Sequence, residues 1–284
     1  MEWSPSPITE AGSPRPVGRA IVDHLFAGED NGRIPVVGVT GTRGTTPVAQ
    51  IVAHMLRLSG KRVGLGCATG MHLGRRRLEH GDCANWKTAR RLLQNRLVDA
   101  AVLENGPWTL ANEGLAYDRC QVGIVTHLDP YGALPDNFID TPEQMFRLLR
   151  TQVDVVLARG AAVLNAHDPA VVEMAGLCDG EIIFFGSDPA MPAMVAHRAA
   201  GGRAILLTDG NIAIANGHDQ DVIVTLEAAA PQAGSGSDIW RAGIAIECLL
   251  AAVGAACALN LRSDLIATAI HTFVPDYAGA EVSA

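Results

Sequence analysis

The sequence predicts an α/β fold: a parallel sheet of the type that carries a phosphate-binding loop (P-loop), with helices on both faces and a small antiparallel β-meander. Three observations predict it. Apolar runs alternate with helical patterns over most of the chain, which is typical of strands joined by crossover helices. The composition is 48% hydrophobic but only 5% aromatic, which suits buried parallel strands better than a β-sandwich. Short segments separated by Asp-Gly and Asn-Gly turns then predict the meander.

The alternation of patterns defines individual elements. Apolar runs predict strands at Ile34–Thr40, Arg62–Leu65, Val98–Leu103, Val122–Thr126, Val153–Leu157, Ala162–Leu164 and Ile182–Phe185. Helical spacing of apolar residues predicts helices at 48–56 and 84–97. Another helix begins after Thr141, because Thr141 suits the N-cap, Pro142 suits the first helical position and Gln144 completes a capping box.

The chain changes character near Pro192. The predicted meander consists of Arg203–Leu207, Asn211–Ala215 and Asp221–Leu226, and a Gly/Ser linker is expected at Ala233–Asp238. The stretch Ile239–Leu261 is long and apolar enough to suggest a membrane span, but it is rich in alanine and contains charged residues. A buried helix at 239–259 in a soluble domain is therefore the favoured interpretation, followed by a helix near 265–273.

Composition limits the functional classes. The chain of 284 residues has a net charge of −8 and a pI of about 5.5, so no basic surplus indicates nucleic-acid binding. Its six cysteines form no CxxC pair, and no signal peptide or membrane anchor is apparent, which predicts reduced thiols and a cytoplasmic protein without a membrane partner. The expected organisation is a lead-in (1–30), a central domain (31–275) and a tail (276–284).

An arginine run, Arg75-Arg76-Arg77, follows the turn Leu73-Gly74-Arg75 of a predicted hairpin at Met71–Gly81. A solvated sheet edge is the favoured interpretation of this run. The alternative is a contact with an anionic ligand or a partner, because guanidinium groups pair well with oxyanions.

The stretch "VGVTGTRGTTP" (37–47) predicts a phosphate-binding loop between a strand and a helix. Glycines at 38, 41 and 44 allow backbone N–H groups to turn inward, and the following helix presents its N-terminus. The candidate nucleotide-binding residues are Gly38, Gly41, Thr42, Arg43, Gly44, Thr45 and Thr46.

The chain resembles the Mur ligase family over about residues 15–275. The resemblance rests on "NGRIPVVGVTGTRGTT" (31–46), "GKRVG" (60–64), "VDAAVLE" (98–104), "EGLAYDRCQVGIVT" (113–126), "AVLNAHDP" (162–169) and "GGRAILLTDGNIAIANG" (201–217). It is most similar to the Mur-ligase-like portion of cyanophycin synthetase, an enzyme described as joining aspartate and arginine into a polymer while ATP activates carboxylates. The ATP-grasp domain and the C-terminal Mur domain are expected to be lacking from this chain.

The resemblance implies ATP and Mg²⁺ as cofactors and assigns roles to several residues. Thr46 falls at the hydroxyl position for Mg²⁺, and Glu104 at the position of a carboxylate associated with Mg²⁺. His127 is a further candidate metal ligand, with Asp129 a weaker one, although a simple hydrogen-bonding role is favoured for His127.

Five family residues are replaced. Thr45 stands in place of the loop lysine, Leu149 in place of a second lysine, and Cys248 in place of an asparagine that contacts adenine. An arginine after Glu104 and a histidine after His127 have no counterpart. Arg43 is the one residue whose guanidinium could compensate, and a loop retained without ATP hydrolysis is the favoured interpretation.

Two hypotheses follow for the function, and the enzyme assignment stays open. The favoured one is a catalytically degenerate module that scaffolds or regulates a cyanophycin-type synthetase, by forming a homo-oligomer or by binding that synthetase. The alternative is an ATP-dependent amide-forming ligase, for Asp/Arg polymer synthesis, that a partner chain completes.

Overall fold

The computed structural model describes residues 32–128, 134–226 and 244–276, and the chain divides into two units, Met1–Ile34 and Pro35–Ala284. Every described helix and strand belongs to the second unit. The strands are β1 (Val36–Thr40), β2 (Val63–Cys67), β3 (Gly70–Leu73), β4 (Arg76–His80), β5 (Ala100–Asn105), β6 (Cys120–Val125), β7 (Val156–Asn165), β8 (Glu181–Gly186), β9 (Arg203–Thr208), β10 (Asn211–Asn216) and β11 (Asp219–Thr225).

The helices connect and cover these strands. They are α2 (Thr45–Leu58), α3 (Trp86–Leu93), α4 (Pro107–Asn112), α5 (Pro142–Leu149), α6 (Thr151–Asp154), α7 (Pro169–Glu173), α8 (Pro192–Ala199), α10 (Ile246–Ala258) and α11 (Ser263–Thr272), with short 3₁₀ helices η1 (Pro135–Asn137) and η2 (Met174–Leu177).

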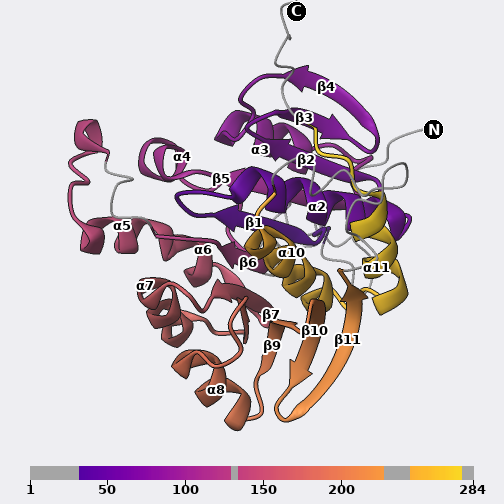
Figure 1. Ribbon diagram of the computed structural model, residues 1–284. Helices are drawn as coiled ribbons and strands as arrows, with labels where there is room; N and C mark the ends of the chain where they lie inside the picture. Colours follow the sequence, from indigo (N-terminus) through magenta and orange to yellow (C-terminus); the bar gives the residue numbers. More distant parts are fainter. Residues whose placement is uncertain (1–31, 129–133, 227–243, 277–284) are drawn as a thin grey trace, which may run out of the picture. The chain divides into compact units, whose positions relative to one another are not determined.

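The strands form one eleven-stranded mixed sheet in the order β11-β10-β9-β8-β7-β6-β1-β5-β2-β3-β4 (Figure 1). Every neighbouring pair from β9 to β2 is parallel, and antiparallel strands extend the sheet at both edges. The predicted α/β fold with a meander is therefore confirmed. The meander is no separate insertion, however, because β9 pairs in parallel with β8 and continues the main sheet.

Helices lie on both faces of the sheet, as predicted. Side chains alternate along a strand, so the apolar residues Val37 and Val39 of β1 join the core beneath α2 and α10, while Gly38 faces α6. Helix α10 is buried from Cys248 to Cys257, which confirms a core helix over Ile246–Ala258 of the predicted 239–259. Residues 239–243 and the predicted linker Ala233–Asp238 lie outside the described residues, and the helix begins later than predicted. Among the residues that the structure describes, every helix is too short or too polar to cross a bilayer.

Local sequence patterns predicted some elements correctly and misplaced others. The capping box of α5 is present, with Gln144 N–H donating to Thr141 Oγ1 and the Gln144 side chain accepting from Thr141 N–H. The expected helix 84–97 is shorter, and Asn85 caps its start. The two strands expected at Val153–Leu157 and Ala162–Leu164 are wrong: Val153 belongs to α6, and β7 runs unbroken to Asn165 past a bulge in its pairing with β6.

Candidate functional site

The candidate residues meet at the carboxyl ends of β1, β5 and β6. Strand β1 lies between β5 and β6, and the chain leaves β1 through α2 toward β2 but leaves β5 through α4 toward β6. Connections that diverge to opposite sides of a strand open a crevice at the carboxyl edge of a parallel sheet, where ligands bind in such folds.

The loop from Gly41 to Gly44 is fixed against the end of β6. Thr42 N–H donates to the His127 carbonyl at 3.0 Å, and Thr126 Oγ1 donates to the Arg43 carbonyl at 2.6 Å. Gly41 has a φ of 141°, and a Cβ there would lie 2.1 Å from Thr126 Oγ1. Gly44 caps α2 with a φ of 77°. The glycines therefore serve a tight turn at the N-terminus of α2, which is the geometry expected of an anion-binding loop.

Thr45 and Thr46 both point at Glu104. Thr45 Oγ1 donates to Glu104 Oε1 at 2.7 Å, and Thr46 Oγ1 lies 2.8 and 3.0 Å from the two carboxylate oxygens. The Ala68 N–H, just after β2, donates to Glu104 Oε2 at 2.8 Å. Glu104 lies within β5 and directly opposite Val39 of β1, so the strand register places its carboxylate beside the loop. Thr45, at the position where the resemblance implies a lysine, thus donates its hydroxyl hydrogen bond to a buried carboxylate.

Burial raises the pKa of Glu104, although hydrogen bonds from Thr45, Ala68 and Thr46 act in the opposite direction. The side chain is only 6% exposed. Among the charges near this carboxyl group, Asp82 raises its pKa further. Among the residues that the structure describes, hydroxyl and amide donors satisfy the group, and no cation pairs with it.

The oxygen donors of Thr46 and Glu104 are of the type that magnesium prefers. Two ligands at adjacent corners of an octahedron with bonds of 2.0–2.1 Å lie about 2.9 Å apart. The separations of 2.8 and 3.0 Å between Thr46 Oγ1 and the Glu104 oxygens are ordinary hydrogen-bond lengths and are compatible with that geometry as well. These two residues would hold the ion, which would neutralise phosphate charge when bound with nucleotide.

Arg43 and Cys248 differ in their exposure at the loop. Arg43 is exposed. Cys248 Sγ donates to the Gly44 carbonyl at 3.7 Å and is 7% exposed, so this side chain is packed against the loop. Burial, with a smaller effect from Glu247, raises the pKa of Cys248 to about 11, whereas Arg43 acts to lower it. A neutral, buried thiol thus occupies the position where the resemblance implies an asparagine.

His127 contributes its backbone to the loop and its ring to β7. Its carbonyl accepts from Thr42, while its Nε2 lies 3.1 Å from Asn165 Nδ2. The hydrogen-bonding role favoured for His127 therefore agrees with these contacts. Leu149 is fully buried in α5, and Asp129 lies outside the described residues.

A buried polar network below the loop was missed by sequence reasoning. Asn105 Nδ2 donates to Tyr117 Oη at 2.9 Å, and Tyr117 Oη donates to Gln152 Oε1 at 2.7 Å. Gly38 lies within β1, and a Cβ at this position would clash with Tyr117 Oη and with the side-chain amide of Gln152. The absence of a side chain at Gly38 therefore makes room for this network. The available signal was Asn105, which follows Glu104 at the polar end of a strand that is apolar up to Leu103.

Comparison with known proteins identifies the relatives of this chain. No protein-family model matches it. Cyanophycin synthetase of Geminocystis herdmanii is 35% identical over 228 residues, which cover 78% of this chain and 26% of that protein. The enzyme of Trichormus variabilis is 33% identical over 264 residues, covering 92% of this chain and 28% of that protein. This chain therefore spans about a quarter of the length of the synthetases that it matches.

More distant relatives are peptidoglycan-precursor ligases. The UDP-N-acetylmuramyl-tripeptide synthetase of Deinococcus radiodurans is 29% identical over 171 residues, covering 56% of this chain and 33% of that protein. A solved UDP-N-acetylmuramoyl-L-alanyl-D-glutamate–2,6-diaminopimelate ligase has a TM-score of 0.61 at 14% identity and covers 91% of this chain and 50% of that one, a likeness of fold. The chain is thus a homologue of the Mur ligases that matches the Mur-ligase-like portion of cyanophycin synthetase.

Proposed function

We propose that this chain is a catalytically degenerate Mur-ligase-like module that scaffolds or regulates a cyanophycin-type synthetase. The hydrogen bond from Thr45 to Glu104 is the observation that supports this proposal most strongly. At the position where the family carries a lysine, the side chain is short, neutral and turned toward a buried carboxylate. No cationic side chain is therefore directed into the loop from that position.

The missing charge matters because of the chemistry of acyl-phosphate formation. Phosphoryl transfer depends almost entirely on positioning and on stabilising charge on the phosphate oxygens. Removing a single donor of this kind costs about 10²–10³ in rate. Here the neutral residues Thr45, Leu149 and Cys248 replace two lysines and an amide, so useful turnover is not expected.

A second candidate function is an ATP-dependent amide-forming ligase that a partner chain completes. The spacing of Thr46 and Glu104 favours it, because it suits a magnesium ion bound with ATP. The glycine turn at the start of α2 also remains suited to phosphate. Under this hypothesis Arg43, on the exposed side of the loop, supplies the charge that Thr45 lacks.

Turnover separates the two candidates. ATP hydrolysis and polymer formation are measured with Mg²⁺, aspartate, arginine and a cyanophycin primer, with and without a complete cyanophycin synthetase. The scaffold proposal predicts no turnover by the chain alone, and association with the synthetase in analytical ultracentrifugation. Turnover by the chain mixed with a synthetase that is itself inactivated at its loop lysine, and loss of that turnover in Arg43→Gln of this chain, would overturn the scaffold proposal and support the ligase.

A further inference from the structure

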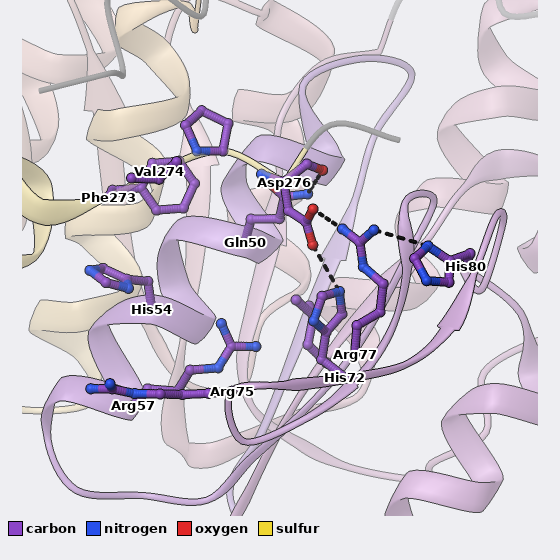
Figure 2. Close-up of a pocket in the computed structure, with 12 residues that line it drawn as sticks. Gln50, His54, Arg57, His72, Arg75, Arg77, His80, Phe273, Val274 and Asp276 are labelled. Atoms are coloured by element: carbon purple, nitrogen blue, oxygen red, sulfur yellow. Dashed lines mark hydrogen bonds and ion pairs between the residues drawn. The ribbon is translucent and has the colours of Figure 1, made fainter. Parts of the chain in front are cut away.

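A second cluster of polar groups lies along α2, beyond the loop. Gln50, His54 and Arg57 lie on one face of this helix at positions i, i+4 and i+7, and they form one wall of a cavity of about 470 Å³. Figure 2 shows the opposite walls: the β3–β4 hairpin with His72, Arg75, Arg77 and His80, and the segment 273–276 that follows α11.

The lining of this cavity carries an excess of positive charge. Three arginines face it against a single carboxylate, that of Asp276. Asp276 forms an ion pair with Arg77, and its Oδ2 lies 3.4 Å from His72 Nε2. Gln50 fixes the backbone of Asp276, donating to its carbonyl at 2.9 Å and accepting from its N–H at 3.1 Å. The carboxylate of Asp276 therefore occupies the part of the cavity next to Arg77 and His72.

The other part of the cavity has cations without a counter-charge among the described residues. Arg57 Nε and Nη2 are buried and have no hydrogen-bond partner there. Burial lowers the pKa of Arg57, and the nearby positive charge of Arg75 lowers it further, so the two guanidinium groups lie within electrostatic range of each other. Buried polar groups in proteins are almost always satisfied, so these guanidinium nitrogens call for a partner in the cavity, and an anion is the partner that also balances their charge.

Two of the three arginines in the run line the cavity. Arg75, in the turn before β4, and Arg77, within β4, belong to the lining, whereas Arg76 does not. Arg75 and Arg76 are both exposed, and Arg77 is half-buried. The arginine run therefore combines two residues of the cavity wall with one, Arg76, outside it.

We propose that this cavity binds a small oxyanion with two or more negative charges, held by Arg57 and Arg75, and that the Asp276 carboxylate occupies part of the same site. Phosphate and carboxylate groups share the chemistry that planar guanidinium forks recognise. The volume exceeds that of a single ion and suits a metabolite-sized molecule. The proposed site is separate from the loop at Thr45 and Thr46 and does not depend on ATP binding there.

The histidines of the cavity add a dependence on pH. Burial, followed by Arg57, Arg77 and His80, lowers the pKa of His72 to about 4, and burial together with Arg57 and Arg75 lowers that of His54. The Asp276 carboxylate, 3.4 Å from His72, acts in the opposite direction to the arginines. An anion placed among these groups also offsets the arginine charge and favours protonated histidine, so binding should raise the pKa values of both histidines.

Calorimetric titration of the full chain with pyrophosphate and with citrate, without metal ions, tests the proposal. Saturable binding of either probe is expected, pyrophosphate indicating a phosphate ligand and citrate a carboxylate ligand. Arg57→Gln and Arg75→Gln should each weaken binding at least tenfold. Asp276→Asn should tighten it several-fold, because it removes the competing carboxylate.

Two variants serve as controls. Arg76→Gln makes the same charge change on the same hairpin but outside the cavity, and should leave affinity unchanged. Thr46→Val alters the loop and should also leave it unchanged. The proposal is overturned if neither probe binds, if Arg76→Gln weakens binding as much as Arg75→Gln does, or if Thr46→Val abolishes it. Arg57→Lys keeps a charge and checks that lost binding in Arg57→Gln does not reflect lost folding.

Discussion

The two halves of helix α2 present opposite arrangements of charge. At its N-terminus, the Glu104 carboxylate is satisfied by the hydroxyls of Thr45 and Thr46. Three turns further on, Arg57 has no carboxylate partner among the described residues and faces a cavity whose single carboxylate, that of Asp276, pairs with Arg77. The loop has a glycine turn at a helix N-terminus but a neutral Thr45 beside it, whereas the cavity has cations but no glycine turn. Under our two proposals, backbone architecture and charge are separable parts of an anion site.

The largest expected effect comes from the backbone of the loop. In Gly41→Ala the new Cβ would lie 2.1 Å from Thr126 Oγ1 at a φ of 141°. We expect a loss of about 3 kcal/mol in the free energy of unfolding, measured by urea denaturation. Gly60→Ala is the matched control, because Gly60 also has a positive φ but nothing within 4 Å, and about 1 kcal/mol is expected there. Equal losses of stability in Gly41→Ala and Gly60→Ala would contradict the tight turn at Gly41.

Glu104 should affect stability nearly as much. Glu104→Ala leaves the Thr45 hydroxyl and the Ala68 N–H without their acceptor, and a loss of about 2–3 kcal/mol is expected. Glu104→Gln keeps an acceptor oxygen and should cost less.

The effect of Glu104 on stability should also depend on pH. Because burial raises the pKa of Glu104, folding favours its protonated form, and this contribution to the free energy of unfolding is lost as the pH rises through the raised pKa. The stability of Glu104→Gln relative to the wild type should therefore improve as the pH increases from 4 to 7. A constant difference over that range would contradict the raised pKa.

His72 tests the cationic cavity in the opposite pH direction. Its pKa is lowered from 6.5 to about 4, so the unfolded chain takes up the proton first as the pH falls, and stability is lost between these two values. Between pH 7 and pH 4.5 we expect the wild type to lose about 2 kcal/mol more than His72→Gln. Parallel pH profiles for the two proteins would show that His72 does not face the arginines as described.

Local interactions were predictable from the sequence, and long-range ones were not. The capping box of α5 involves residues three apart, so the pattern alone predicted it. Two strands were predicted where β7 runs continuously, because a bulge in its pairing with β6, which no local pattern reveals, lets the strand continue. The loop glycines were identified by their spacing, since a strand–turn–helix motif is local.

Side-chain partners far apart in sequence required the structure. Glu104 was identified from the resemblance, but its hydrogen bond to Thr45 spans 59 positions and depends on the parallel register of β1 and β5. The cavity combines α2 with Asp276, which is 226 positions from Gln50. The sequence also does not reveal which of the three consecutive arginines, 75 to 77, faces Asp276, because that depends on the register of the hairpin.

The central claim, that the loop retains its backbone but lacks the cation for nucleotide, is tested most directly by calorimetric titration with MgATP. We predict no measurable binding by the wild type, and restored Mg²⁺-dependent binding in Thr45→Lys, whose ammonium would supply the missing charge. Thr45→Gln, of similar length but neutral, is the matched control and should not bind. Tight Mg²⁺-dependent binding by the wild type, lost in Arg43→Gln, would contradict the account and show that Arg43 already provides that charge.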